Sequence, residues 1–437
     1  MAAWLRGCVA ALAGRLLSGI LQGPMRALVF DLSIPKYLLA RALGAKRRRL
    51  HFGPGTCFDL RDIATPARPG PDWGAIAPEQ VGLCGTDLGT IFFKLSPALS
   101  AVSTTPCVLG HEILARVVAP PARGVDALGR PLREGERVVV DPFVGCATRG
   151  LAEDEACASC RVGSYATCER AGVGPRRGVM LGAGTELPGG FAERTNAHEF
   201  QMFGVEGRVA PDLAVLTEPL AVAVQAVATH APHEGRVLVL GAGPIGLAVT
   251  WALHRLRPAV ETTVVSLEEF QLDHARRLGS VHTRRPAVDV DVVETLGAQL
   301  ATAVLRPKLG RPFLAGGYDA VFECVGAATS LDDALRVVRP RGTLVMAGCQ
   351  GVVPSIDLTF VWSRELRVVG TVAYGWCTDL AGARRRTFDV TLDLMADDAE
   401  RLRPLLTHSM PLERYGDAID VSIDRRASRS VKIVLRP

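Results

Sequence analysis

The stretch GRVLVLGAGPIGLAVTWALHRL, from Gly235 to Leu256, gives the strongest indication of how the second half of the chain folds. Its first apolar run, Val237 to Leu240, predicts a buried strand, and a GxGxxG pattern follows before a helical apolar rhythm begins. Glycines at these places permit a tight turn and a close approach of the backbone to a pyrophosphate, which the unpaired N–H groups at the helix start then bind. The stretch therefore predicts a strand–turn–helix unit that binds a dinucleotide.

Four further apolar runs follow, each separated from the next by helix-like or polar sequence. They are ETTVVS (261–266), YDAVFECVG (318–326), TLVMAG (343–348) and LRVVGTVAYG (366–375). Continuous Val/Leu runs are typical of strands buried on both faces, and hence of a parallel sheet covered by helices. The expected fold class is α/β, with a doubly wound parallel sheet of the Rossmann type in this half.

The choice between the two nicotinamide dinucleotides depends on the end of the second strand. A carboxylate roughly 20 residues beyond the glycine pattern normally holds the ribose 2′-hydroxyl of NAD. This chain has Ser266 at that place, with Glu268 and Glu269 just beyond. Ser266 removes the charge that would repel a 2′-phosphate, but no arginine follows at once to attract one, so NAD and NADP both stay open. The residues expected to contact the dinucleotide are Gly241, Gly243, Pro244, Ile245, Gly246 and Ser266.

Composition excludes several classes of protein. The 437 residues are 48% apolar, which is enough to bury two cores and excludes a disordered or collagen-like chain. Fifty basic against 45 acidic side chains leave a net charge of only +5, which favours an enzyme over a nucleic-acid binder. Eleven cysteines would leave one unpaired in a secreted chain, whereas an intracellular protein can use thiolates to bind metal. We therefore expect a cytoplasmic enzyme.

The N-terminal segment is interpreted separately. Residues 1–24 lack acidic residues, carry two arginines and place apolar residues along one helical face. They are either a presequence for an organelle or an over-extended start upstream of the true one at Met25. No membrane span is expected, because a span takes about 20 uninterrupted apolar residues. The sequence then predicts a strand from Met25, a short helix over 34–43 and a solvated loop at the basic run Lys46–Arg49.

A compact group of thiols lies in the first half of the chain. Cys157, Cys160 and Cys168 have the close spacing of metal-binding cysteines, and Cys146 can complete a tetrahedron of four sulfurs. Four soft ligands with no open position suit structural zinc, which would stabilise a loop that has little core of its own. The alternative interpretation is a set of buried free thiols.

A second set of ligands is more widely spaced. It consists of Cys84, His111 with Glu112, and Glu218. One thiolate, one imidazole and one carboxylate leave a fourth position for water or substrate, which is the pattern of catalytic zinc. Taken singly, such residues prove little, since a lone histidine is more often part of the core than a ligand.

Six motifs, in this order, resemble those of the zinc-dependent medium-chain dehydrogenase/reductase family, nearest its polyol (sorbitol) and threonine dehydrogenase branch. They are GLCGTD (82–87), GHE (110–112), the cysteine group at 146–168, GGFAE (189–193), EPLAVAVQAV (218–227) and GAGPIG (241–246). The resemblance covers almost everything after Met25. It implies a GroES-like β-barrel catalytic domain at 25–215 and 375–437, a Rossmann domain at 216–374, an active site between the two, and homodimers or homotetramers.

The resemblance also implies roles for single residues. Cys84, His111 and Glu218 correspond to ligands of catalytic zinc, and Glu112 corresponds to a glutamate that lies beside the metal and ligates it in some states. Asp87 corresponds to an acid that orients the His111 ring.

The proton route departs from the family pattern. Thr86 corresponds to the hydroxyl that hydrogen-bonds the substrate oxygen and begins proton removal. Many relatives then pass the proton on through a histidine five residues after the zinc cysteine, where this chain has Gly89. Thr86 would therefore have to use the ribose and water.

Two further departures concern structure. Eight extra residues lie between Cys146 and Cys157, which could alter the geometry of the sulfurs. Pro78 stands inside the strand expected before GLCGTD, where it removes a hydrogen-bond donor and should weaken the pairing locally.

Together these features predict a zinc-dependent oxidoreductase that transfers a hydride between a secondary alcohol or polyol, or the matching ketone, and NAD or NADP, with Zn²⁺ as Lewis acid. The two alternatives are a zinc-independent reductase of conjugated carbonyls on the same fold and a dinucleotide-binding sensor without catalysis. Residues 91–106 are expected to line the substrate cleft. The other cysteines, Cys349 among them, are interpreted as ordinary small apolar residues.

Overall fold

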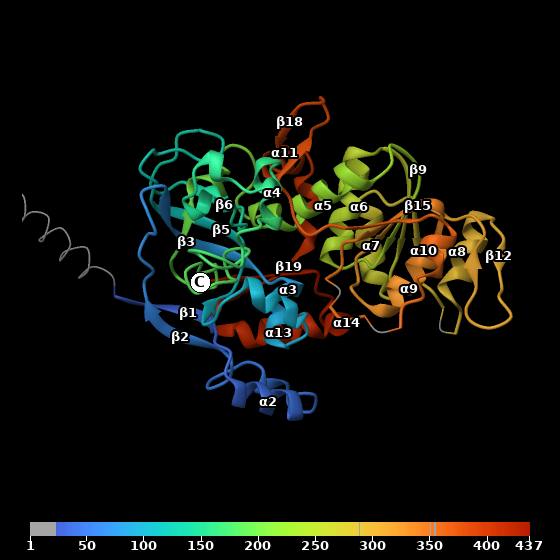
Figure 1. Ribbon diagram of the computed structural model, residues 1–437, viewed down its shortest axis with the longest axis horizontal. Coiled ribbons are helices and arrows are strands. Elements are labelled where there is room, and N and C mark those ends of the chain that lie inside the picture. The colour runs from blue at the N-terminus through green and yellow to red at the C-terminus, as the bar shows by residue number, and fades with distance from the viewer. Residues whose placement is uncertain (1–22, 288, 350, 354) are drawn as a thin grey trace, which may run out of the picture.

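The computed structural model describes residues 23–437 apart from 288, 350 and 354, so almost all of the predicted N-terminal extension lies outside the described residues. Figure 1 shows two lobes side by side, one built around the strands labelled β3, β5 and β6 and the other around β9 and β15. In the described part of the chain, no helix combines the length and the apolar character needed to cross a membrane.

The second lobe contains a six-stranded sheet in which every pairing is parallel. Its strands are β9 (Glu234–Leu240), β10 (Ala259–Val265), β11 (His282–Arg284), β14 (Tyr318–Glu323), β15 (Val338–Met346) and β16 (Arg367–Gly370). The order β11-β10-β9-β14-β15-β16 is that of the doubly wound fold, which confirms the predicted Rossmann sheet. The order reverses between β9 and β14, and the carboxyl ends of these strands are where such sheets bind ligands.

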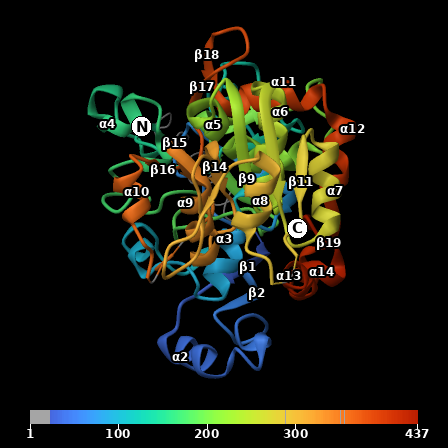
Figure 2. The same ribbon diagram turned by 90° about the vertical axis from the view of Figure 1, so that its right-hand side faces the viewer.

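Helices cover both faces of this sheet, whose strands β16, β15, β14, β9 and β11 follow one another from left to right in Figure 2. They are α5 (Thr217–His230), α6 (Pro244–Leu256), α7 (Glu269–Arg277), α8 (Val292–Leu300), α9 (Ala328–Val337) and α10 (Thr359–Ser363). Along β9, Val237 and Val239 belong to the core shared with α5, α6 and α7, whereas Leu238 and Leu240 belong to the core shared with α8 and α9. Burial on both faces is the reason why this strand is apolar throughout.

The first lobe has a seven-stranded sheet of order β19-β20-β3-β5-β6-β8, with β7 beside β3, and a smaller sheet of order β2-β1-β4. Its strands are β1 (Pro24–Phe30), β2 (Phe58–Ala64), β3 (Trp73–Gly82), β4 (Cys107–Val108), β5 (Glu112–Ala119), β6 (Arg137–Val140), β7 (Thr195–His198), β8 (Met202–Gly204), β19 (Leu406–Pro411) and β20 (Lys432–Arg436). The last strand, β20, pairs antiparallel with β3, so the end of the chain completes the sheet of the first lobe. The GroES-like part of the fold prediction is confirmed.

Pro78 disturbs β3 as the sequence predicts. The register with β5 shifts between Pro78, which lies opposite Ala115, and Gln80, which lies opposite Leu114. An irregularity of this kind accommodates the missing N–H donor, and the strand continues to Gly82. The disturbance therefore leaves the approach to Cys84 intact.

The remaining elements connect the two lobes or lie at the edges of one of them. They are α2 (Ile34–Leu43), η1 (Arg48–Leu50), α3 (Gly85–Ile91), η2 (Pro97–Val102), η3 (Ala147–Arg149), η4 (Glu153–Glu155), α4 (Ala158–Arg161), η5 (Tyr165–Thr167), η6 (Glu199–Gln201), η7 (Ala214–Leu216), β12 (Val304–Leu305), β13 (Phe313–Leu314), β17 (Trp376–Thr378), β18 (Arg384–Arg386), α11 (Thr387–Ala396), α12 (Ala399–Leu402), η8 (Arg403–Leu405), η9 (Leu412–Arg414), α13 (Tyr415–Ile423) and α14 (Arg425–Ser428). The predicted helix over 34–43 is confirmed as α2. The basic run Lys46–Arg49 lies in the turn that joins α2 to η1 and enters its first residues.

Candidate active site

The start of α3 holds three of the predicted site residues on one turn. Cys84 is the residue that caps this helix, and its backbone N–H donates to Oδ2 of Asp87 at 2.9 Å. A carboxylate that accepts at the N-terminus of a helix is also stabilised by the helix dipole. Cys84, Thr86 and Asp87 therefore keep a defined relation to one another.

His111 and Glu112 are held at the start of β5 by a glycine. Gly110 has a φ of +92°, and a Cβ on it would lie 2.7 Å from the ring of Phe191. Only glycine fits here, since other residues rarely adopt this φ and the space is filled. The turn directs His111 and Glu112 back towards Cys84.

One ligand atom from each of Cys84, His111 and Glu112 lies within 4.8 Å of the other two. Tetrahedral zinc holds its ligand atoms about 3 to 4 Å apart, so this donor set fits the ion after small side-chain rotations. Nδ1 of His111 lies 3.5 Å from Oδ1 of Asp87. Burial lowers the pKa of His111, but the charges of Asp87 and Cys84 outweigh it and raise that pKa well above its usual value. The negative charges of Asp87 and Cys84 would also attract a metal cation to this place.

Glu218 stands apart from this group of three ligand atoms. It lies in the first turn of α5, where its Oε1 accepts a hydrogen bond of 2.9 Å from Oη of Tyr374. Burial raises the pKa of Glu218 to about 7, while the charge of His111 lowers it. The structure thus brings three of the four predicted ligands together. Glu218 lies beside them and is hydrogen-bonded to Tyr374.

Lys432 is a charged neighbour of the site that no sequence pattern indicates. Its ammonium group forms an ion pair with the carboxylate of Glu112, and both side chains are almost fully buried. Lys432 comes from β20, 320 residues after Glu112. Because a buried carboxylate without a partner is costly, Lys432 compensates Glu112 whenever that residue does not bind metal.

The side chain of Leu95 occupies the space beside Gly89 where a side chain would begin. A Cβ on Gly89 would lie 2.6 Å from Cδ2 of Leu95, whose side chain fills that space. Oγ1 of Thr86 lies 3.4 Å from Nε2 of His111, in the region where a substrate oxygen would approach. Thr86 is therefore the hydroxyl at the metal group, without a histidine behind it at position 89.

The glycine loop after β9 has the geometry that dinucleotide binding requires. Gly241 has a φ of +92°, and a Cβ on Gly246 would lie 1.8 Å from the carbonyl oxygen of Gly241. Pro244 is the first residue of α6, where its missing N–H costs nothing, and Ile245 packs against the core. The N–H groups at the start of α6 are thus presented at the carboxyl end of β9.

Arg425 lies directly over this loop. Its Nη1 is 3.4 Å from the place where a Cβ of Gly243 would be, and its Nε donates to the carbonyl oxygen of Ser422 at 3.0 Å. Burial lowers the pKa of Arg425, and the charge of Cys84 opposes this shift. Arg425 thus lies near both the glycine loop and Cys84, and no sequence pattern indicated it.

We expect Arg425→Ala to weaken dinucleotide binding about tenfold, because a charge-assisted contact to the pyrophosphate is lost. Fluorescence titration with the reduced dinucleotide measures this. Arg341→Ala is the matched control, since the Arg341 side chain is 80% exposed and forms just one long ion pair, of 3.7 Å, with the exposed Glu365. Equal dissociation constants for the wild type and Arg425→Ala would refute the role.

Ser266 is buried at the end of β10. Its Oγ donates to Oε1 of Gln271 at 2.6 Å and accepts from the N–H of Glu268 at 3.1 Å. A cavity of about 470 Å³ beside it is lined by Glu268, Arg285 and Arg426, among others. No arginine directly follows Ser266 in the sequence. Arg285, just after β11, and Arg426, in α14, instead bring positive charge to this cavity.

Cys349 departs from its interpretation as an ordinary apolar residue, which is wrong because its side chain is exposed. It follows β15, at the carboxyl end of the parallel sheet. Gly351 follows closely, and a Cβ there would lie 3.3 Å from the carbonyl oxygen of Lys94. Here the Rossmann lobe meets the segment 91–106 that was expected to line the cleft.

The four cysteines of the thiol group converge. The sulfur atoms of Cys146, Cys157, Cys160 and Cys168 all lie within 4.8 Å of one another. Three backbone N–H groups in the loop point at these sulfurs at 3.3 to 3.5 Å. A hydrogen bond from Cys160 lowers the pKa of Cys168 to about 5 although burial raises it. Four sulfurs in this arrangement, with N–H donors around them, fit structural zinc.

The eight extra residues do not separate the sulfurs. The segment between Cys146 and Cys157 forms the two short helical turns η3 and η4. Within η3, Arg149 is buried, and its guanidinium donates to the carbonyl oxygens of Val144 at 3.1 Å and Gly178 at 2.6 Å. Its charge also acts on Cys168. The insertion thus adds a cation that holds the group in place and partly offsets its negative charge.

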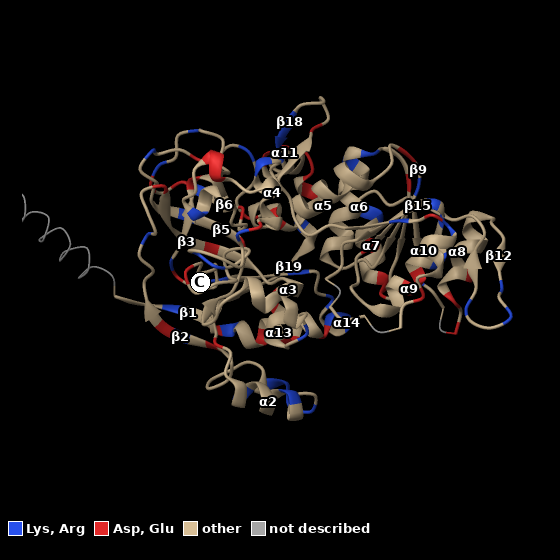
Figure 3. Ribbon diagram, viewed as in Figure 1, with Lys and Arg blue, Asp and Glu red and all other residues tan. Residues whose placement is uncertain are grey.

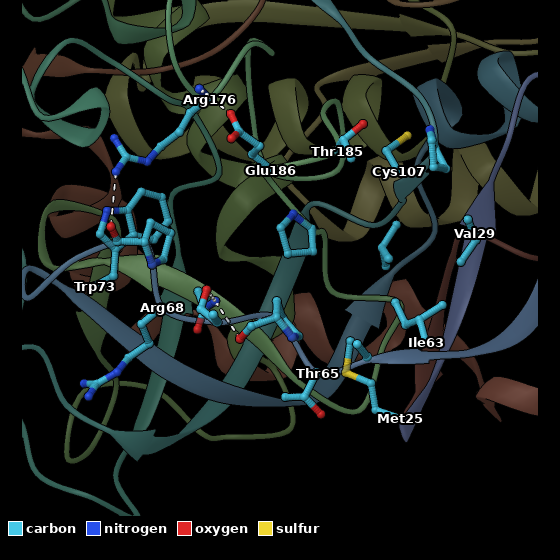
Figure 4. Close-up of a pocket in the computed structure, with 18 of the residues that line it drawn as sticks. Met25, Val29, Ile63, Thr65, Arg68, Trp73, Cys107, Arg176, Thr185 and Glu186 are labelled. Carbon is cyan, nitrogen blue, oxygen red and sulfur yellow. Dashed lines mark hydrogen bonds between the residues drawn. The ribbon is translucent and has the colours of Figure 1, made fainter. Parts of the chain in front are cut away.

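A cavity of about 620 Å³ in the first lobe is lined by none of the residues predicted to bind metal or dinucleotide or to act in catalysis. Figure 4 shows Trp73 and the two arginines Arg68 and Arg176 at one side and Met25 and Ile63 at the other. It lies beside β1 and β2 rather than at the carboxyl ends of the parallel strands, so it is not the catalytic cleft.

Comparisons with known proteins agree with this geometry. Residues 70–206 match the model of the alcohol dehydrogenase GroES-like domain, and residues 244–396 match that of the zinc-binding dehydrogenases. The chain belongs to the zinc-dependent medium-chain dehydrogenase/reductases, the alcohol dehydrogenase-like family. It is an oxidoreductase of that class, which acts on CH–OH groups with zinc and a nicotinamide dinucleotide.

Several curated relatives resemble the chain over most of its length. Sorbitol dehydrogenase of Bos taurus is 26% identical over 85% of this chain and 91% of its own. L-threonine 3-dehydrogenase of Saccharopolyspora erythraea is 26% identical over 87% and 96%. The solved structure of 2R,3R-butanediol dehydrogenase from Bacillus subtilis has a TM-score of 0.66 at 24% identity, over 94% of this chain and 99% of its own, and shows the same fold.

Proposed function

We propose that this protein oxidises a secondary alcohol, in particular a vicinal diol or another polyol, to the ketone and catalyses the reverse reaction, with NAD or NADP as the hydride carrier. The observation that carries the proposal is the group formed by Cys84, His111 and Glu112, which lies next to Arg425 and the glycine loop. The names of the relatives, which include dehydrogenases of sorbitol and of L-threonine, point to the same substrate class.

We assign the catalytic metal to Cys84 and His111, with Glu112 or Glu218 as the carboxylate ligand, and a second, structural zinc to the four cysteines at 146–168. Bound at the first site, zinc would act as a Lewis acid towards the substrate oxygen. Asp87 holds the His111 ring in orientation. Lys432 neutralises Glu112 while that carboxylate is not a ligand.

The remaining steps fall to residues of the chain and to the dinucleotide. Thr86 accepts the hydrogen bond of the substrate hydroxyl and passes its proton towards the ribose and water, because Gly89 offers no relay. The glycine loop and Arg425 fix the pyrophosphate, which positions the nicotinamide for hydride transfer. Ser266 accepts either dinucleotide, and Arg285 with Arg426 would offer positive charge to a 2′-phosphate.

Assembly and compartment are part of the proposal. Strand β16 pairs with β15 on one side, and its Val368 is exposed together with Trp362 of α10. An edge of this kind suits pairing with a second copy, in a homodimer or homotetramer. The ten described cysteines form no disulfide, which supports the cytoplasm, or an organelle if residues 1–24 are a presequence.

A panel of vicinal diols, polyols and amino alcohols, each assayed with both dinucleotides, tests the proposal when zinc is measured on the same sample. We expect turnover of at least one diol or polyol and two zinc ions per chain. A metal-free but active protein would instead indicate a zinc-independent reductase. Tight dinucleotide binding without oxidation of any alcohol would indicate a sensor.

A further inference from the structure

Helix α2 turns its apolar side chains towards solvent. Only Ala40 is buried within the helix. The exposed apolar residues in and just before the helix are Leu32, Ile34, Leu38, Leu39 and Leu43, which are between 45% and 71% exposed. Positions 34 and 38, and positions 39 and 43, are each four residues apart, so the four side chains spread over about half the circumference of a helix of 3.6 residues per turn. Large apolar residues gathered on one exposed face normally mark a surface that binds something.

Positive charge adjoins this apolar face. Residues 32–49 are here called the α2 surface. Its exposed cations are Arg41, Lys46, Arg47, Arg48 and Arg49. Of these, Arg49 pairs with Asp420 at 2.6 Å, and the other four have no ion-pair partner among the described residues. Figure 3 shows the blue segments at the end of α2. The α2 surface therefore combines a leucine-rich face with four uncompensated cations.

Within the part of the chain that the structure describes, nothing covers the leucines of the α2 surface. In both Figure 1 and Figure 2, α2 projects from the first lobe, away from the parallel sheet. Its inner side is already packed: the rings of Tyr37 and Phe93 lie 4.8 Å apart edge to face, and Nζ of Lys36 donates to the carbonyl oxygen of Thr56 at 3.2 Å. The ring of His51 lies 4.9 Å from that of Phe92. These contacts fix the inner side of α2 against the first lobe, so the side with Leu38, Leu39 and Leu43 faces solvent.

We propose that the α2 surface binds the surface of an anionic lipid bilayer, so that the protein associates peripherally with a membrane. Apolar side chains of such a helix enter the boundary between headgroups and acyl chains, and neighbouring lysines and arginines are attracted to anionic headgroups. A second copy of the chain is a poorer occupant, because it would bring two sets of unpaired cations together. The bilayer satisfies the leucines and the cations at once.

Binding at this surface would also bring the catalytic end of the first lobe near the membrane. Phe92 and Phe93, on which α2 and η1 pack, directly follow α3, which carries Thr86. The proposal does not depend on the substrate assigned above, since it concerns a surface outside the catalytic group.

Sedimentation of the full-length protein with vesicles tests the proposal. We expect about tenfold stronger partitioning onto vesicles of phosphatidylcholine with phosphatidylglycerol than onto phosphatidylcholine alone, and a decrease with added salt. L38E/L39E, which alters the apolar face, and R47E/R48E, which reverses two charges, should each reduce partitioning about tenfold or more. Turnover of a water-soluble substrate should stay unchanged in both variants.

The matched control is K308E/L309E, which changes one cation and one apolar residue in the loop between β12 and β13, where Leu309 is 90% exposed. It should bind vesicles as the wild type does. The proposal is overturned if the wild type does not bind anionic vesicles, or if both α2 variants bind them as strongly as the wild type. Light scattering that shows a lipid-independent dimer, dissociated by L38E/L39E, together with no vesicle binding, would assign the surface to self-association instead.

Discussion

Cys84→Ala should lower turnover by about three orders of magnitude or more while dinucleotide binding stays close to that of the wild type. Cys84 provides the one thiolate among the three ligand atoms that converge within 4.8 Å, and the imidazole and carboxylate left behind form a much weaker site for zinc. The substitution does not alter the glycine loop or Arg425, so the contacts proposed for the dinucleotide stay in place. Three measurements on one preparation test this: initial rates for turnover, metal analysis for zinc content, and fluorescence titration for dinucleotide affinity.

The control for this variant is Cys57→Ala, which removes a buried thiol outside both metal groups and should leave turnover and zinc content unchanged. The turnover of Asp87→Asn should lie between those of Cys84→Ala and Cys57→Ala. We expect a decrease of about 10- to 100-fold, because this substitution disturbs the orientation of His111 without removing a ligand. Wild-type turnover in Cys84→Ala would mean that the reaction does not use zinc at this place.

Cys168→Ser should release one zinc ion per chain and unfold the loop around the four sulfurs. This loop has only short helical turns, and its core consists of the cysteines and a few small neighbours, so the metal supplies most of its stability. We expect a loss of several kcal/mol locally. Hydrogen exchange should show amide protection lost over residues 144–178 and retained in the strands of the parallel sheet.

The control here is Asp154→Asn, in the same insertion but without a sulfur ligand, which should keep both zinc and protection. Retention of two zinc ions and of full amide protection by Cys168→Ser would contradict the structural site and favour the interpretation as buried free thiols. Catalytic zinc should remain in Cys168→Ser, so a residual turnover well above that of Cys84→Ala is expected.

Much of this fold could be predicted because its signals are local. The strand–turn–helix at Gly235–Leu256, the helix over 34–43 and the irregularity at Pro78 each follow from residues within a few positions of one another. A strand buried on both faces must be apolar throughout, and a positive φ next to a filled space must be glycine, so such elements can be recognised without tertiary contacts.

The candidate site was predictable only where its residues stand in short motifs. Cys84, His111 and Glu112 could be proposed as a group because the motifs that carry them resemble those of a known family. Lys432 and Arg425 could not, because each comes from the C-terminal segment and meets its partner across hundreds of residues; Lys432 and Glu112 are 320 residues apart. Nothing in the local sequence of a buried lysine distinguishes it from one in solvent.

The order of the motifs and the apolar rhythm of the chain were enough to predict the two-part α/β architecture, the glycine loop and two candidate sets of metal ligands, since each of these signals lies in short stretches of sequence. Only the tertiary structure decided which ligands converge, that Leu95 occupies the space at Gly89, that the insertion supplies Arg149, and that the leucines of α2 face solvent. The physical reason is that burial and charge compensation are set by contacts between distant segments, which a linear pattern does not encode.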